Sequence, residues 1–118
     1  MPIVGKIRER ATFRALRRPD GRSVHGPLRV AYVPPRGPDA AFPQVAYAVG
    51  RRCGNAVVRN RLRRRLRAAV AETAPDLVPG AYLVTCGPEA ADLGWPELAA
   101  GLRAALLAAA SPRMAVAP

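Results

Sequence analysis

Residues 50–70 read GRRCGNAVVRNRLRRRLRAAV, and the fold is expected to form around this stretch. Eight of the 18 arginines of the 118-residue chain lie here, and no acid occurs from residue 40 to residue 71. Apolar residues nevertheless recur inside it at helical spacing, as at Val58, Leu62 and Leu66. The pattern predicts one helix that packs on a sheet with one face and presents guanidinium groups with the other.

The ends of this basic helix carry clear signals. Asn55 is a good N-cap, so the helix is expected to run from Ala56 to about Thr73, where Ala74-Pro75 ends it. Arg51–Gly54 is expected to be a loop before the cap. Arg65 falls close to the apolar side, so it is expected either to extend its charged end outward to solvent or to lie at the packing edge of the helix.

Two strands are expected before the basic helix, at Leu28–Val33 (LRVAYV) and Gln44–Gly50 (QVAYAVG). In the second strand, alternation predicts a core face made of Val45, Tyr47 and Val49. The opposite face is a strip without bulky side chains, formed by Ala46, Ala48 and Gly50. Such a strip either leaves room for a ligand or packs closely against a helix, and the pattern alone does not distinguish these.

The remaining segments complete an α+β order. Lys6–Arg18 is expected to form a short amphipathic helix, Ala81–Cys86 a third strand and Pro96–Ala110 a last helix. The order of helix, strand, strand, basic helix, strand and helix predicts a small two-layer sandwich in a single domain. Between these elements, loops or loose ends are expected at residues 1–5, 19–27, 36–43 and 111–118.

The composition points to an anionic partner. The net charge is +11, and a small domain so unbalanced repels itself unless something neutralises it, for which nucleic acid is the usual candidate. A genome that favours arginine codons would explain Arg in place of Lys, but not a basic block without acids. No apolar run approaches the roughly 20 residues that cross a bilayer, so we expect a cytoplasmic protein without a membrane partner.

No catalytic or metal site is evident. Cys53 and Cys86 lie 33 residues apart, and His25 is the sole histidine, so the usual zinc patterns are missing and the cysteines are expected to be buried or partly buried free thiols. Glu89 and Asp92 are too weak a signal for a magnesium site. If the chain takes part in a reaction, its catalytic groups are expected to come from a partner.

The basic stretch suits recognition of an RNA backbone. Guanidinium groups match phosphate oxygens and stack on bases, and Arg51 and Arg52 extend the basic surface around the helix N-terminus. A solvated charged face is the plain alternative, but such faces normally mix signs for pairing along the helix. Tyr32 on the first strand is a candidate to stack a base beside the small-residue strip, although a strand aromatic is more often core.

At Asn55–Arg61 (NAVVRNR), followed by Arg63-Arg64 and Leu66-Arg67, the sequence closely resembles the signature of the bacterial ribonuclease P protein subunit. The resemblance extends to Phe13 in a basic helix and to the strands on either side of the signature. It implies a fold like the second domain of ribosomal protein S5, with room for an extra strand. It also implies a left-handed strand–helix–strand crossover, where general rules favour the right-handed form.

The resemblance further implies an accessory subunit that pairs with a catalytic RNA, in a 1:1 complex, to remove the 5′ leader of precursor tRNA. Mg²⁺ would be held mainly by that RNA and the substrate, and no catalytic or metal-binding residue is expected in this chain. RNA-binding roles would pass to Arg51, Arg52, Asn55, Arg59, Asn60, Arg61, Arg63, Arg64 and Arg67. Leader-cleft roles would pass to Phe13, Tyr32, Ala46, Ala48 and Gly50. Family members often carry a second aromatic where this chain has Arg17.

Three rival classes stay open at this point. A structural RNA-binding protein, for example a ribosomal one, shares the same composition. A helix-turn-helix DNA binder would need a second helix just before the recognition helix, where strand signals stand instead. A membrane-surface helix is disfavoured because the apolar arc lacks aromatic anchors.

Overall fold

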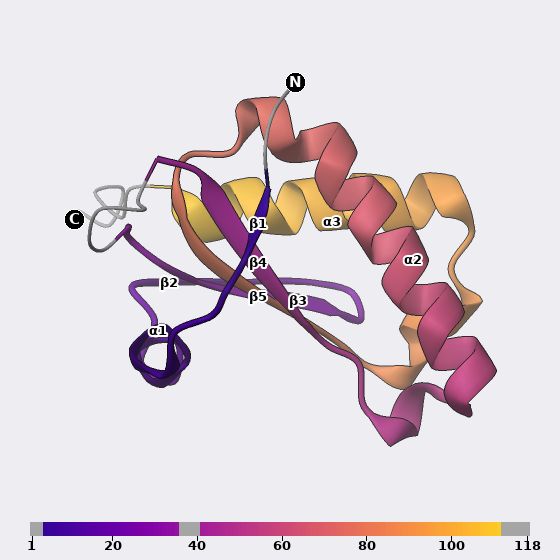
Figure 1. Ribbon diagram of the computed structural model, residues 1–118. Coiled ribbons are helices and arrows are strands. Elements are labelled where there is room, and N and C mark those ends of the chain that lie inside the picture. Colours follow the sequence, from indigo (N-terminus) through magenta and orange to yellow (C-terminus); the bar gives the residue numbers. More distant parts are fainter. Residues whose placement is uncertain (1–3, 36–40, 112–118) are drawn as a thin grey trace.

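The computed structural model describes residues 4–35 and 41–111. Over these residues, five strands form one mixed sheet and three α-helices pack against it (Figure 1). In chain order they are β1 (Gly5–Lys6), α1 (Arg10–Ala15), β2 (Gly21–His25), β3 (Leu28–Val33), β4 (Pro43–Ala48), α2 (Ala56–Thr73), β5 (Gly80–Cys86) and α3 (Trp95–Ala110). Three short 3-10 turns join them: η1 (Arg51–Cys53), η2 (Ala74–Asp76) and η3 (Pro88–Asp92).

The strand order in the sheet is β1-β4-β5-β3-β2. β4 and β5 are parallel neighbours, so the chain between them crosses over through α2, while β3 pairs antiparallel with both β5 and β2. The α+β class and the crossover around the basic helix are therefore confirmed. The left-handed sense of that crossover stays a prediction.

The larger core lies between one face of the sheet and the two long helices (Figure 1). α2 contributes Leu62, Leu66, Ala69 and Val70, and α3 packs beside it over β2 and β3. The residues that meet them from the sheet are alternate strand positions, namely Leu28, Val30, Val45, Val49, Tyr82, Val84 and Cys86. β4 ends at Ala48, two residues before the predicted end of the strand, but the predicted inward face is confirmed, because Val45 and Val49 are buried and Tyr47 packs against this core.

A second, smaller core lies on the opposite face, under α1. Leu16 and Ile7 pack there against Val33 and Ala81, with Ala46 and Leu83 at the margin. α1 therefore adds a partial cover to the side of the sheet that α2 and α3 leave free. The sheet thus separates α1 from the basic helix.

α2 begins and ends at the residues predicted from the sequence. The Oδ1 of Asn55 accepts a hydrogen bond from the backbone N–H of Val58 at 3.0 Å, which satisfies one of the unpaired donors of the first turn. At the other end, the chain turns through η2 at Ala74-Pro75. The side chain of Thr73, the one buried polar residue of the described core, bonds back to the carbonyl of Ala69.

Three expectations about the first third of the chain are wrong. Gly5, expected in a loose end, belongs to β1, which pairs in parallel with β4. The helix expected over Lys6–Arg18 is limited to α1, since Lys6 is in a strand and Ile7 fills the small core before the helix starts. The loop expected over residues 19–27 contains β2. The predictions for residues 1–3, 36–40 and 112–118 lie outside the described residues.

Candidate nucleic-acid interface

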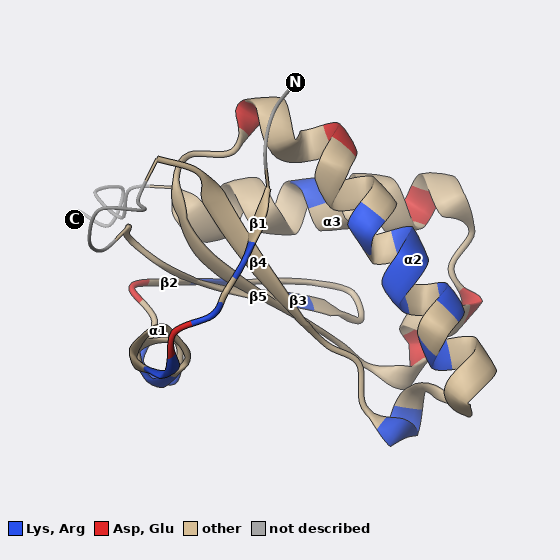
Figure 2. Cartoon of the chain, in the orientation of Figure 1, with Lys and Arg blue, Asp and Glu red and all other residues tan. Residues whose placement is uncertain are grey.

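Arginines recur in η1 and along α2 (Figure 2). We name this set the basic surface; its arginines are Arg51, Arg52, Arg59, Arg61, Arg63, Arg64 and Arg67. Over the described residues, none of them forms an ion pair, and the one salt bridge joins Arg103 of α3 to Asp76 of η2 at 2.7 Å. The charge of the basic surface is therefore not neutralised within the described part of the chain, which favours a polyanionic partner.

Arg63 links the basic helix to the end of β4. Its Nη1 donates to the Oδ1 of Asn60 at 3.2 Å, and its Nη2 donates to the carbonyl of Val49 at 3.4 Å. The guanidinium of Arg63 is thus held toward the end of β4 and does not point directly away from the sheet. Asn60 keeps its amide N–H groups available as donors.

Two other arginines of α2 have clear partners. Arg67 lies over the ring of Tyr47, with 5.7 Å between the guanidinium carbon and the ring centroid. Burial raises the pKa of Tyr47 to about 12, although the charge of Arg67 acts in the opposite direction, so the phenol stays neutral near pH 7. Arg65 donates to the carbonyl of Leu93 at 2.7 Å, which anchors the segment before α3. Its predicted position at the packing edge is confirmed.

Arg59 is a special case within the basic surface. Its side chain is half-buried, and its Nε is buried without a hydrogen-bond partner. Its neighbours Arg61 and Arg64 are exposed. The set thus divides into arginines held by protein partners, such as Arg63, and arginines whose guanidinium groups are open to solvent.

A groove of about 550 Å³ opens where β4 and β5 end, beside η1. Ala48 and Gly50 line it together with Arg52, Arg63 and Thr85. Both small residues are exposed, and a Cβ placed on Gly50 would meet nothing within 4 Å. Two of the three predicted floor residues therefore border an open groove that also contains guanidinium groups.

The third predicted floor residue, Ala46, is only partly accessible, because the small core under α1 packs against it. Phe13 is 43% exposed on α1 and is free to contact a ligand. These two residues lie on the side of the sheet that α1 partly covers. Of the predicted floor residues, Ala48 and Gly50 are thus exposed, whereas Ala46 is partly covered near α1.

The prediction that Tyr32 lies beside this floor is wrong. Tyr32 packs on the opposite face, with its ring 4.9 Å from that of the fully buried Tyr82 and its hydroxyl donating to the carbonyl of Pro79 at 2.8 Å. Burial, and then the charge of Asp20, raise the pKa of Tyr32. Alternation within LRVAYV separates the two faces of β3 but does not identify which face meets the helices.

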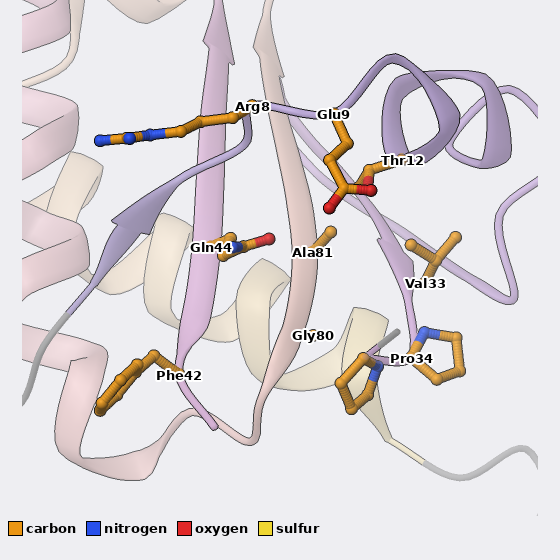
Figure 3. Close-up of a pocket in the computed structure, with 10 residues that line it drawn as sticks. Arg8, Glu9, Thr12, Val33, Pro34, Phe42, Gln44, Gly80 and Ala81 are labelled. Atoms are coloured by element: carbon orange, nitrogen blue, oxygen red, sulfur yellow. The ribbon is translucent and has the colours of Figure 1, made fainter. Parts of the chain in front are cut away.

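A small pocket, about 80 Å³, lies at the start of α1, between that helix and the first residues of β4 and β5 (Figure 3). Glu9 and Thr12 point into it above Ala81, whereas Arg8 extends away across β4 (Figure 3). A carboxylate at its rim disfavours phosphate. This pocket is therefore less suited to an anion than the groove beside η1, whose lining contains Arg52 and Arg63.

Sequence reasoning missed two groups of groove residues. Thr85 comes from β5, far away in sequence from the basic stretch, and no local signal relates it to Gly50. Cys53 and Cys86 both line the groove, where their sulfur atoms approach to 3.9 Å. Their state as buried free thiols is confirmed.

Other kinds of site find no support in the described part of the chain. Residues 4–35 and 41–111 contain no group of three or more His, Cys, Asp or Glu side chains placed to hold a metal ion. None of the described helices is both long and apolar enough to cross a membrane. The segment directly before α2 is a strand and a turn, which is not the arrangement of a helix-turn-helix.

Comparison with known proteins decides the family. The family model described as Ribonuclease P matches residues 1–110. The chain belongs to the ribonuclease P protein family. The ribonuclease P protein component of Thermobifida fusca is 40% identical over 114 residues, covering 92% of this chain and 78% of its own length. That of Acidothermus cellulolyticus is 39% identical over 102 residues, covering 85% and 83%.

Solved structures of ribonuclease P proteins share the fold. The Staphylococcus aureus protein matches with a TM-score of 0.71 at 19% identity, covering 86% of this chain and 91% of that chain. The Thermotoga maritima protein matches with a TM-score of 0.69 at 16% identity, covering 82% and 90%. The β-strand and helix arrangement of the ribonuclease P proteins is thus retained here despite low identity.

Proposed function

We propose that this chain is the accessory protein subunit of a ribonuclease P ribonucleoprotein, which binds the catalytic RNA and the 5′ leader of precursor tRNA. The observation that carries the proposal is the basic surface, whose seven arginines have no acidic partner among the described residues. Phosphate groups would supply the missing counter-charge, and release of counterions from the RNA would favour binding. Membership of the family makes a catalytic RNA the expected partner.

The geometry supports separate binding surfaces for the two RNAs. Exposed guanidinium groups on the outer side of α2, such as those of Arg61 and Arg64, suit the backbone of a folded RNA. The groove beside η1 suits a single strand, because Ala48 and Gly50 leave its floor low while Arg52 and Arg63 supply charge at its rim. Phe13 is then available to stack a base farther along the same side of the sheet.

In this proposal the protein assists a reaction that it does not catalyse. Mg²⁺ ions, held by the RNA and the substrate, would supply the chemistry for hydrolysis of the phosphodiester that releases the leader. The arginines reduce repulsion between two polyanions and place the leader. One protein per RNA, acting in the cytoplasm, completes the proposal.

The leader assignment is tested with Gly50→Leu in the reconstituted ribonucleoprotein. A leucine at this open position should fill the groove without disturbing the core, since nothing lies within 4 Å of the added Cβ. We expect the affinity for precursor tRNA to fall by roughly tenfold, which corresponds to about 1.4 kcal/mol. The affinity for a substrate that lacks the leader should stay unchanged.

The matched variant is Arg64→Ala, which should weaken assembly with the catalytic RNA and leave the preference for leader-bearing substrate unaltered. If Gly50→Leu reduces affinity for both substrates equally, the groove is not the leader site.

A further inference from the structure

Cys53 and Cys86 are the two cysteines of the chain, and the fold brings them into contact from 33 residues apart. Their Sγ atoms are 3.9 Å apart. The Cys53 thiol also lies 3.5 Å from the carbonyl of Cys86 and 3.6 Å from that of Gly87. Neither the family signature nor the proposed RNA contacts give this pair a role.

The pair is accessible to small molecules although it is mostly buried. Cys53 is 6% exposed and Cys86 is 9% exposed, and the exposed parts of both line the groove that contains Arg52 and Arg63. The thiolate, not the thiol, is the reactive form of a cysteine. Burial, followed by the proximity of Cys53, raises the pKa of the Cys86 thiol, so Cys53 is the better candidate for the first attack.

We propose that Cys53 and Cys86 are an oxidation site, which a hydroperoxide converts to an intramolecular disulfide, and that this disulfide weakens RNA binding. In the first step the Cys53 thiolate attacks the peroxide oxygen, giving a sulfenic acid and releasing an alcohol or water. In the second, the Cys86 thiol displaces the hydroxyl of the sulfenic acid, forming the S–S bond and water. Two thiols are oxidised and one hydroperoxide is reduced.

The structure indicates which side must move. A disulfide holds its sulfur atoms about 2.05 Å apart, so the two thiols must approach by roughly 2 Å. Cys86 ends β5 and is paired with Leu28 of β3, whereas Cys53 sits in the three-residue turn η1. We therefore expect η1 to move toward β5.

This movement acts on the proposed RNA site. Arg51 and Arg52 directly precede Cys53, and the groove lies between η1 and the end of β5. Closing that gap narrows the groove and shifts both arginines. The coupling between oxidation and RNA binding rests on the proposed function, while formation of the disulfide does not.

The test uses the full chain, reduced with dithiothreitol or oxidised with hydrogen peroxide, and a fluorescently labelled single-stranded oligouridylate as the RNA probe. Mass spectrometry without reductant should show the loss of two hydrogen atoms and a Cys53–Cys86 linked peptide. Fluorescence anisotropy should show affinity falling about threefold to tenfold on oxidation, as expected for weakened charge-assisted contacts, and recovering with dithiothreitol.

Cys86→Ala is the matched control, because it keeps Cys53 and both methionines but cannot form the disulfide. Its affinity should not respond reversibly to peroxide. A second measurement needs no variant. The equilibrium constant for oxidation of the wild-type thiol pair by glutathione is measured without RNA and with saturating RNA. The two values should differ by the same factor as the RNA affinities of the reduced and oxidised protein.

The outcomes separate the two claims. Sulfinic acid on a single cysteine without a linked peptide overturns the oxidation site. A disulfide that leaves oligouridylate affinity unchanged overturns the coupling. Failure of the reduced wild-type protein to bind any RNA contradicts the proposed function and the coupling together, and the mass measurement then still decides the disulfide.

Discussion

Arg64 and Arg65 are sequence neighbours with different surroundings, and this difference makes a paired prediction. Arg64 is exposed, whereas Arg65 donates to the carbonyl of Leu93. Arg64→Ala should leave the free energy of unfolding within about 0.5 kcal/mol of wild type. It should also reduce the slope of log affinity against log salt by about 0.7–0.9, the effect of one lost phosphate contact. RNA titrations over a range of salt concentrations measure this slope.

Arg65→Ala should give the reverse result. Loss of its hydrogen bond leaves the Leu93 carbonyl without that donor, which should destabilise the fold by about 1–2 kcal/mol in urea denaturation. Its salt slope should stay close to that of wild type. If Arg64→Ala leaves the slope unchanged, Arg64 does not contact a phosphate.

The glycines at either end of η1 make a second pair. Gly54 has φ near +139°, and a Cβ there would lie 2.7 Å from the side chain of Val58. Gly54→Ala should therefore destabilise the protein by about 1–3 kcal/mol. Gly50→Ala, in ordinary extended backbone with open space around it, should be close to neutral. Thermal unfolding of the two variants compares them directly, and equal melting temperatures would contradict the geometry of η1.

At the scale of elements, the N-cap of α2 should contribute measurably to stability. Asn55→Ala removes the acceptor for the Val58 N–H and should cost about 1 kcal/mol in urea denaturation. Asn60→Ala is the internal control, because Asn60 is exposed in mid-helix and bonds only to Arg63. The control should change stability by no more than about 0.5 kcal/mol. If Asn55→Ala is as stable as Asn60→Ala, water replaces the capping hydrogen bond of Asn55 without loss of stability, and the prediction is wrong.

Elements with strong local signals were predictable from the sequence. The bounds of α2 follow from Asn55, the apolar arc and Pro75, and β3 follows from the run between Gly26-Pro27 and Pro34-Pro35. β5 and α3 differ from their predicted starts by one residue. These segments carry their own period and their own stop signals, so tertiary contacts did not alter them.

β2 was missed because its pattern is inverted. The residues that face α3 are Gly21, where a Cβ would clash with the carbonyl of Ala109, and Ser23, whose hydroxyl donates to the carbonyl of Ala105. The apolar Val24 is 67% exposed. The close approach of α3 thus requires small or polar residues on the inner side of β2. A search for alternating apolar residues does not detect such a strand.

β1 and the groove could not be predicted from the sequence, for a different reason. A strand of two residues has no period, and its identity depends entirely on pairing with β4. The groove combines residues of β4, η1, α2 and β5. The arginines and the small-residue strip were identified from the sequence, but their placement around one opening required the crossover.

At the scale of the whole molecule, the proposed RNA contacts gather where η1 and α2 lie beside the ends of β4 and β5. The outer side of α2 presents charge that the described part of the chain leaves unpaired, and the end of β4 opens into a groove beside it. The family and the fold are those of the ribonuclease P proteins. In the proposed ribonucleoprotein, the protein would contribute binding and placement, and the RNA would contribute the catalytic groups.

Reconstitution with ribonuclease P RNA at low Mg²⁺ tests this central claim most directly. The rate of 5′-leader removal from precursor tRNA is measured for the RNA alone, for the nuclease-free protein alone, and for the two together. We predict no cleavage by the protein, little by the RNA, and restored cleavage by the complex, because arginines replace part of the Mg²⁺ that screens the phosphates. Cleavage by the RNA-free protein, or a complex no faster than the RNA alone, would contradict the account.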